Sequence, residues 1–414
     1  MSIQLGIIAV SSLLLLARIV ESQAVFDVTD PRNGGSRGAN ADITQGFLNS
    51  WKKACESTTP SKVLVPKGYY MLGEVKIEGP CKAPVELSLQ GTVKAPADPK
   101  VFKSDGWITI NYVSQLTVSG GGTFDGQGKL SWDLDQCKKK FNCAFPANNK
   151  KTCYYLKQNV RFNFVDNSTV SHIRSLNSKN FHFTVLGCNN FIFQNIYVIA
   201  PGTSFNTDGI HMGLSYNVSV LDSTIMTGDD CISMGDGTRN VTVERVNCGP
   251  GHGISIGSLG KTQNEQPVVG FTVKNCTFTG TQNGVRIKTW PTPKTGVVTD
   301  IHYEDLIMND VSNPIIIDQE YCPLNQCNRS TPSRIKISNV RIKNVTGTSA
   351  TQVAVKLSCS KASPCENVEI GDINLTYKGP GGRATSECAN VQPKFTGKQN
   401  PPVCAARAVF LVEP

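Results

Sequence analysis

Acidic residues and one histidine stand at corresponding places of a short repeated pattern in the middle of this chain. Asp208-Gly209-Ile210-His211-Met212-Gly213 returns 22 residues later as Asp230-Cys231-Ile232-Ser233-Met234-Gly235, and a third copy begins 22 residues further on, at His252. Asp229 directly precedes the second copy. If the copies stack in register, three carboxylates and an imidazole crowd onto one face, where mutual repulsion raises at least one carboxyl pKa. This arrangement favours general acid–base chemistry.

A looser copy follows and brings basic residues. Asn283-Gly284-Val285-Arg286-Ile287-Lys288 places Arg286 and Lys288 two residues apart, so in a strand both side chains leave the same face. Arginine binds planar carboxylates through two parallel hydrogen bonds, which makes the two cations candidates for holding an acidic ligand. Taken singly, a histidine or an Asp-Asp pair is more often structural, so the chemical interpretation depends on all the motifs standing in register. His211 is predicted to pack against the core or to shape a turn.

The elements that would position these residues are the coils of a solenoid. A repeat of 22 to 31 residues, with alternating β-branched residues and Gly-rich turns, predicts one coil of a parallel β-solenoid per copy. Residues in register then lie about 4.7–4.9 Å apart. Asp229 and Asp230 are neighbours, whose side chains would point to opposite faces in a strand, so a turn or bulge must bring both to one groove.

A second repeat supports this fold independently. Strand starts recur at Asn167, Asn190, Asn217 and Asn240, which gives each coil at least two strands. An antiparallel sandwich would require hairpin turns between neighbouring strands, and Asn-Gly or Asp-Gly dipeptides rarely fall there. No Pro/Ser linker or low-complexity run divides the chain. We therefore expect an all-β protein, a single right-handed parallel β-helix over residues 25–414.

A capping helix is predicted at the N-terminal end of the solenoid. It runs from about Ile43 to Cys55, with Asp42 as N-cap and Trp51 on its apolar face. The end of a solenoid leaves strand backbone and core side chains uncovered, so a helix is a suitable cover.

Residues 1–24 have the features of a secretory signal peptide. Leu5–Ala17 is the apolar core, and Ser22-Gln23-Ala24 offers small residues at a cleavage site. A membrane anchor would need about 20 apolar residues, and Arg18 and Glu21 interrupt the run. We expect a secreted, soluble protein with no membrane contact after cleavage.

The charge of the chain points to a class of partner. The 414 residues carry a net charge of +9, which suits an acidic polymer. Nucleic acid is disfavoured, because no run of Lys and Arg is interleaved with aromatic residues. Paired CxxC motifs are lacking, so no cysteine metal site is expected, and neither a metal nor a cofactor is predicted. We expect a monomer.

Fifteen cysteines in an exported chain predict disulfides, and the odd number leaves at least one unpaired. Close spacing predicts five local pairs: Cys55–Cys81, Cys231–Cys248, Cys322–Cys327, Cys359–Cys365 and Cys388–Cys404. Spacing does not assign Cys137, Cys143, Cys153, Cys188 and Cys276. Seven Asn-x-Ser/Thr sequons indicate a glycoprotein: Asn167, Asn217, Asn240, Asn275, Asn328, Asn344 and Asn374.

Four motifs together resemble one family, the polygalacturonases, which are the pectin-hydrolysing members of glycoside hydrolase family 28. Their order and spacing match the family signatures: Asn206-Thr207-Asp208-Gly209, Gly228-Asp229-Asp230-Cys231, Gly251-His252-Gly253 and Arg286-Ile287-Lys288. The resemblance covers almost the whole chain after residue 24. The segment Asp318-Gln319-Glu320-Tyr321-Cys322-Pro323 and the residues around His252 look like the plant pollen-type, exo-acting group.

The resemblance implies an inverting, exo-acting hydrolase of the α-1,4 bonds of polygalacturonic acid, located in the cell wall. Such a reaction needs one carboxyl to protonate the leaving oxygen and one carboxylate to activate water. The resemblance implies Asp229 as the general acid, Asp208 and Asp230 as the residues that activate water, and His252 as a group that tunes the acid. Substrate binding is implied for Arg286, Lys288 and Tyr321.

Other functions remain as alternatives. Endo action differs from exo action by loops that close the groove. A pectate lyase would need calcium and a basic residue that abstracts a proton, whereas the Asp cluster with His252 favours hydrolysis. Rhamnogalacturonan hydrolysis is a closer rival, but the motifs at His252 and Arg286 look like the homogalacturonan type. A non-catalytic wall-binding or allergen-like β-helix is disfavoured because every expected acidic residue is present.

Overall fold

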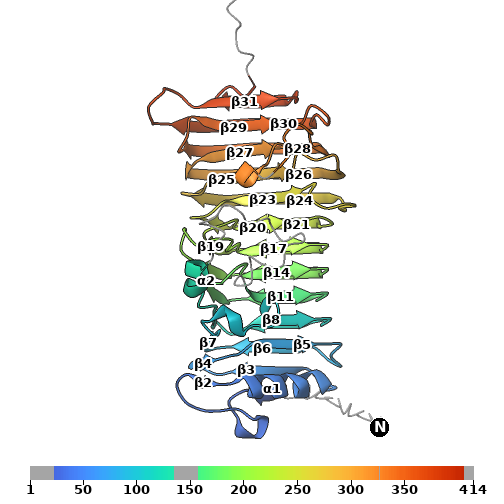
Figure 1. Ribbon diagram of the computed structural model, residues 1–414, viewed down its shortest axis with the longest axis vertical. Coiled ribbons are helices and arrows are strands. Elements are labelled where there is room, and N and C mark those ends of the chain that lie inside the picture. Colours follow the sequence, from blue (N-terminus) through green and yellow to red (C-terminus); the bar gives the residue numbers. More distant parts are fainter. Residues whose placement is uncertain (1–22, 135–156, 326, 405–414) are drawn as a thin grey trace, which may run out of the picture.

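The chain winds into a right-handed parallel β-helix, as the repeats predict. The computed structural model describes residues 23–134, 157–325 and 327–404. The coils stack along one axis from the N-terminal helix at one end to β31 at the other (Figure 1). Parallel pairing between successive coils continues through the whole stack, so residues far apart in the chain become neighbours along the axis.

One sheet of the β-helix has eleven strands and faces the viewer in Figure 1. We call it the eleven-strand sheet. Its members are β5 (Val75–Glu78), β8 (Gly106–Asn111), β11 (Gln158–Asn163), β14 (Phe183–Leu186), β17 (Ile210–Gly213), β20 (Ile232–Met234), β23 (Ile254–Leu259), β25 (Asn283–Thr289), β27 (Asn313–Asp318), β29 (Val353–Ser358) and β31 (Thr385–Ala389).

The other sheet has twenty-one strands and begins as two rows of short strands. The first row is β1 (Ala24–Asp27), β3 (Ser61–Val65), β6 (Val85–Leu89), β9 (Leu116–Ser119), β12 (Ser168–Ser171), β15 (Asn189–Gln194), β18 (Tyr216–Leu221) and β21 (Arg239–Glu244). The second row is β2 (Ala41–Asp42), β4 (Tyr69–Met71), β7 (Thr92–Lys94), β10 (Thr123–Asp125), β13 (Arg174–Leu176), β16 (Tyr197–Ile199), β19 (Thr224–Met226) and β22 (Asn247–Cys248). Both rows pair with β24 (Val268–Thr279) and continue as β26 (Thr295–Val311), β28 (Arg334–Ser349), β30 (Glu366–Tyr377) and β32 (Lys394–Asn400).

A middle coil therefore holds three strands, in agreement with the minimum of two that the sequence predicts. Alternate side chains of each strand point inward and form one continuous apolar core. Phe162, Phe183, Phe191 and Phe193 lie at its centre, with ring centroids 4.9 to 6.3 Å apart. The outward side chains of the eleven-strand sheet are left to form the surface that carries the site.

The asparagines that mark the second repeat form a ladder along the first row of strands. Asn167, Asn190, Asn217 and Asn240 all have a left-handed backbone, with φ between 50° and 54°. Asparagine tolerates this conformation better than most residues. Each amide donates to the asparagine one coil before it, for example Asn190 Nδ2 to Asn167 Oδ1 at 2.9 Å.

The capping helix is α1 (Thr44–Glu56), with Phe47 and Trp51 buried against the first coils. The predicted N-cap was wrong: the cap position is Ile43, which makes no side-chain cap bond. The strand β2 extends to Asp42 and shifts the helix start by one residue. The carboxylate of Asp42 still accepts from Thr44 N at 2.8 Å. A short helix α2 (Lys129–Leu134) and three 3₁₀ turns (Pro31–Asn33, Pro99–Val101, Pro323–Asn325) complete the helical elements of the described residues.

All five disulfides predicted from spacing are present. Cys188 and Cys276 are buried, unpaired thiols. Residues 1–22 of the predicted signal peptide (residues 1–24), and Cys137, Cys143 and Cys153, lie outside the described residues. Within the described part of the chain, no helix is long and apolar enough to cross a bilayer.

Candidate active site

The repeated pattern places three chemical side chains in one row at the edge of the eleven-strand sheet. Ile210, Ile232 and Ile254 pair with one another in register, so the residues two positions before them, Asp208, Asp230 and His252, also lie on successive coils. Each of these three residues precedes its strand, where the chain leaves a turn and enters the sheet. The row therefore lies on turns that the strand register holds in place.

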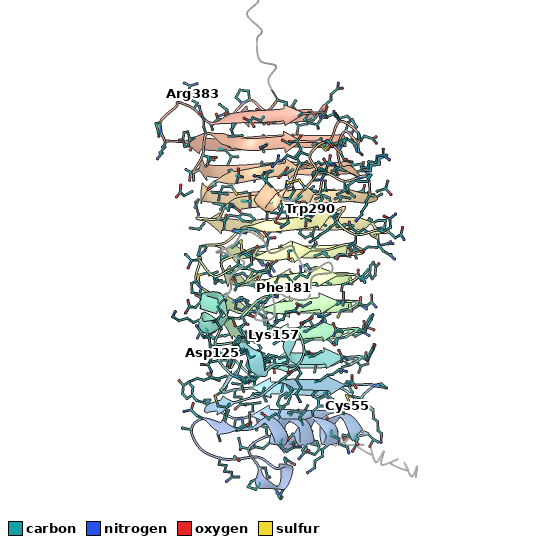
Figure 2. The ribbon with its side chains drawn as sticks, viewed as in Figure 1. Cys55, Asp125, Lys157, Phe181, Trp290 and Arg383 are labelled. Carbon is teal, nitrogen blue, oxygen red and sulfur yellow. A yellow bond between two sulfur atoms is a disulfide. The ribbon has the colours of Figure 1, made fainter. Side chains whose placement is uncertain are left out.

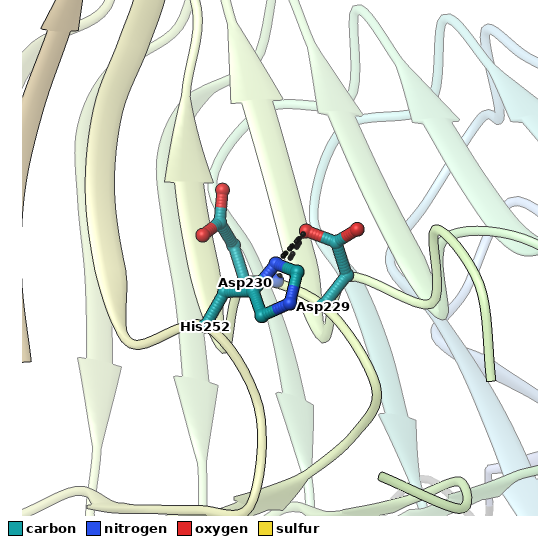
Figure 3. A group of neighbouring side chains, drawn as sticks. All are labelled: Asp229, Asp230 and His252. Atoms are coloured by element: carbon teal, nitrogen blue, oxygen red, sulfur yellow. Dashed lines mark hydrogen bonds and ion pairs between the residues drawn. The ribbon is translucent and has the colours of Figure 1, made fainter. Parts of the chain in front are cut away.

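A tight turn between β19 and β20 brings Asp229 to the same groove as Asp230. The backbone N–H of Asp230 donates to Asp229 Oδ1 at 2.8 Å, and His252 Nδ1 lies 3.1 Å from that same oxygen (Figure 3). Gly228 permits the turn, since a Cβ there would stand 1.9 Å from the carbonyl oxygen of Ser204. The side chain of Asp229 is 20% exposed and that of Asp230 only 2%, so Asp229 reaches solvent while Asp230 is enclosed by protein.

Three donors hold the buried carboxylate of Asp230. Arg286 Nη2 donates to Oδ1 at 2.7 Å, Lys288 Nζ to Oδ2 at 2.7 Å, and Ser255 Oγ to Oδ1 at 2.9 Å. Burial alone would raise the pKa of Asp230, but the charges of Lys288 and Arg286 outweigh burial and hold it at about 2. Asp230 is therefore ionised at any pH well above that value.

Asp208 has the opposite electrostatic environment. Its Oδ2 accepts a hydrogen bond of 2.6 Å from Ser233 Oγ, and no cation contacts it within the described residues. Burial raises the pKa of Asp208 well above its ordinary value, and repulsion from Asp229 and Asp230 adds to the effect. Asp230 thus favours its ionised form, whereas Asp208 in the same row favours its protonated form.

His211 does not have the packing or turn role that the sequence predicts. It leaves β17 outward, its Nδ1 lies 2.7 Å from Ser233 Oγ, and its ring stacks on Phe181 at 4.7 Å between centroids. Burial is the main cause that lowers the pKa of His211 to about 4, so the imidazole is neutral above that pH. The error arises because the strand begins at Ile210, which makes Ile210 the inward residue and His211 the outward one.

Two serines were missed by the sequence reasoning. Each buried carboxylate accepts a bond from the serine one coil further on: Asp208 from Ser233 and Asp230 from Ser255. The two serines occupy the same position of the repeat and pair in register. That shared position was the signal that could have identified them.

Tyr321, for which the family resemblance implies substrate binding, lies beside the two cations. Its ring centroid is 5.5 Å from Lys288 Nζ and 5.9 Å from the guanidinium of Arg286. Trp290 packs edge-on against Tyr321 at 5.6 Å and was not predicted. Burial raises the pKa of Tyr321, so its phenol stays protonated and can donate to a ligand.

Asp229, Asp230 and His252 offer metal-ligand atoms within 4.8 Å of one another. A dication there would meet Arg286 and Lys288, which already neutralise Asp230. The donor set therefore fits a metal poorly, because two fixed cations occupy the strongest ligand.

Comparison with known proteins agrees with this geometry. The sequence profile of "Glycosyl hydrolases family 28" matches residues 55–400. The chain is 52% identical to an exopolygalacturonase of Platanus acerifolia, over 94% of this chain and 100% of the relative, and 51% identical to a polygalacturonase of Nicotiana tabacum, over 96% of both. Among solved structures, a polygalacturonase of Erwinia carotovora superposes with a TM-score of 0.69 at 25% identity, over 86% of this chain and 95% of the other.

Proposed function

The chain belongs to the glycosyl hydrolases of family 28, and on that premise we propose that it hydrolyses α-1,4-galacturonosidic bonds of polygalacturonic acid, the backbone of pectin, from chain ends. The activity in the name of its Platanus relative supports this substrate and exo action. The observation that carries the proposal is the carboxylate row itself: Asp230 is ionised, Asp208 favours a proton, and Asp229 lies at the groove within reach of both.

In this proposal the three carboxylates divide the reaction. Asp229 protonates the leaving oxygen, because it is the most exposed of the three, and the contact with His252 Nδ1 holds its carboxyl group in place. Asp208 and Asp230 share the activation of the attacking water, and Asp208 takes part once it is ionised. No step in this scheme uses a metal or a cofactor.

Arg286, Lys288 and Tyr321 bind a substrate carboxylate. Asp230 occupies one Nη of Arg286 and one hydrogen of Lys288, so each cation keeps further donors for a ligand. The phenol of Tyr321 adds a neutral donor beside them. An esterified carboxyl lacks the charge that makes such bonds strong, which directs the enzyme to de-esterified polymer.

We place the protein outside the cell, in the wall, as a monomer and glycoprotein of the pollen type. The predicted signal peptide, the sequons and the disulfides support export. A single β-helix that buries its own core needs no second copy.

Product analysis on de-esterified polygalacturonate tests the proposed function. Early release of monomer is expected, and early mixed oligomers would mean endo action. An unsaturated product that absorbs in the ultraviolet would mean a lyase. Activity should survive treatment with a chelator, because the donor set already carries fixed cations; loss of activity that calcium restores would support the lyase alternative.

The reaction is further proposed to invert the anomeric configuration. An inverting pair leaves room for a water between acid and base, at roughly 6.5–9.5 Å between the carboxyl groups. Asp208 and Asp229 lie on different turns, one before β17 and the other before β20, so they belong to successive coils. Proton NMR of the first product decides, and initial release of the anomer of the substrate linkage would contradict inversion.

A further inference from the structure

One more arginine lies on the outward face of the eleven-strand sheet, on the opposite side of the carboxylates from Arg286. Register on the outward face of the eleven-strand sheet runs through Arg161, Thr184, His211, Ser233, Ser255 and Arg286. Asp208 shares a coil with His211, and Asp230 shares one with Ser233. Arg161 therefore lies two coils before Asp208, and Arg286 two coils after Asp230, each about 10 Å along the axis.

Arg161 is held in place by polar side chains, not by an acid. Its Nε donates to Asn163 Oδ1 at 2.8 Å, Asn163 Nδ2 donates to Asn111 Oδ1 at 2.8 Å, and Asn111 Nδ2 donates to Glu78 Oε1 at 3.2 Å. This chain of amides over three coils orients the guanidinium. Within the described residues, neither Nη of Arg161 has a hydrogen-bond or ion-pair partner, whereas nearby Lys157 lies 3.8 Å from Asp105.

An aromatic ring completes this side of the groove. Phe181 lies one coil before Asp208 in the same row, because Phe183 pairs with Ile210. Its ring stacks on His211 at 4.7 Å. In Figure 2, Phe181 lies between Lys157 and Trp290 along the axis of the molecule. Each side of the carboxylate row thus carries a cation and an aromatic ring: Arg161 and Phe181 on one side, and Arg286 and Tyr321 on the other.

We propose that Arg161 and Phe181 form a second uronate-binding subsite, on the side of the scissile bond opposite Arg286 and Lys288. This inference rests on the proposed function and deepens it. Every residue of a galacturonan carries a carboxylate, so a chain laid across the carboxylate row presents one to each side. The two Nη groups of Arg161 take the carboxylate through parallel hydrogen bonds, and the ring of Phe181 packs against the apolar face of the sugar.

The residues between Arg161 and the carboxylate row carry no negative charge. His211, the titratable group between Arg161 and the row, is neutral above a pH of about 4, and Thr184 carries no charge. A substrate carboxylate bound at Arg161 therefore meets a positive charge that no described acidic side chain has neutralised. At two coils from Asp208, the bound carboxylate is also far enough from the ionised row to avoid strong repulsion.

Steady-state kinetics with two small ligands tests this subsite. KM and kcat are measured on trigalacturonate, and the fully methyl-esterified trimer is measured as an inhibitor of the same reaction. The variants are Arg161→Gln, Arg161→Lys and Phe181→Ala, with melting temperatures recorded for each. Arg174→Gln is the matched control, because Arg174 lies in the same coil on the other sheet, over the ring of Tyr197.

Arg161→Gln should raise KM for trigalacturonate about tenfold or more, with kcat within about threefold and the inhibition constant of the ester unchanged. Arg161→Lys should give an intermediate KM, since the ammonium group keeps the positive charge but cannot make the two parallel hydrogen bonds of a guanidinium. Phe181→Ala should weaken the acid and the ester alike, because an apolar contact does not distinguish them. Arg174→Gln should match the wild type.

Three results would overturn the subsite. They are an unchanged KM in Arg161→Gln, an equal effect on the free acid and the ester, or an effect of the same size in Arg174→Gln. If Arg161→Gln does not fold, Arg161→Lys decides by the same comparison, and a wild-type KM there overturns the proposal. A wild-type protein that hydrolyses no galacturonan would instead contradict the proposed function, so the two failures are distinguishable.

Discussion

At the level of single residues, the three carboxylates differ through what each side chain touches. Arg286 and Lys288 neutralise Asp230, whereas Asp208 receives only the hydroxyl of Ser233, which in turn contacts the neutral imidazole of His211. Along the same outward row, Ser255 thus has the cation of Arg286 as its neighbour, whereas Ser233 has the neutral ring of His211. This difference, not the identity of the acids, separates their pKa values.

Asp229→Asn should reduce kcat on polygalacturonate by about 10²–10⁴-fold, because it removes the proposed proton donor at nearly constant volume. The melting temperature should stay close to that of the wild type, since the side chain is partly exposed. Asp133→Asn is the control, because that carboxylate is 59% exposed on α2 and its ion-pair partner is Lys129, at 2.7 Å. Retention of more than about a tenth of the wild-type kcat would exclude Asp229 as the acid.

Ser233→Ala should move the acid limb of the pH–rate profile to higher pH. The bond from Ser233 lowers the pKa of Asp208, whose pKa burial already raises, so its loss raises that pKa further. If Asp208 must be ionised to help activate water, activity then appears only at higher pH. Ser255→Ala is the contrast, because the cations keep the pKa of Asp230 near 2 and the limb should not move. Identical profiles for the two variants would contradict the assigned roles.

At the level of elements, the site depends on how closely two turns approach. One turn, between β16 and β17, carries Ser204 and Asp208; the other, between β19 and β20, carries Asp229 and Asp230. Gly228 Cα lies against the carbonyl of Ser204 and lets the turns meet. The strand register fixes the position of each carboxylate along the axis of the β-helix. The contact between the two turns fixes how far apart the carboxylates lie across that axis.

Gly228→Ala should lower kcat at least tenfold and lower the melting temperature, because its Cβ would stand 1.9 Å from Ser204 O and must push the two turns apart. Misplacement of reacting groups by about 1 Å can cost on the order of 100-fold in rate. Gly213→Ala in β17 is the control, since the nearest atom to its Cβ would be 3.7 Å away. Equal kinetics for both variants would show that the turn spacing does not matter.

At the level of the whole molecule, a basic protein acts on a polyanion. The net charge of +9 spreads over a long stack, while the groove floor concentrates Arg161, Arg286 and Lys288 along one axis. Long-range attraction of this kind raises the rate of encounter with an acidic polymer and is screened by salt.

Raising the ionic strength to about 0.5 M should increase KM for polygalacturonate several-fold and leave kcat nearly unchanged, because screening weakens attraction before it affects contacts inside the groove. Highly methyl-esterified pectin should be a poor substrate at every salt concentration and show little salt dependence. Initial rates on both polymers across a salt series provide the measurement. Equal rates on the two polymers at low salt would refute charge recognition.

The sequence by itself determined the β-helix, the row of Asp208, Asp230 and His252, and the common face of Arg286 and Lys288. Each of these follows from periodicity, because a constant repeat length places equivalent residues on successive coils. The five local disulfides followed from short spacing in the same way.

Only the tertiary structure decided the chemistry within that row. The bonds from Arg286 and Lys288 to Asp230 join residues 56 and 58 positions apart, and those from the two serines span 25. Such contacts depend on how far each turn carries a side chain above or below its own coil, and a repeat length does not contain that information. For the same reason, the outward direction of His211 became visible only once the coils were stacked, as did the Nη groups of Arg161, which have no partner among the residues that the structure describes.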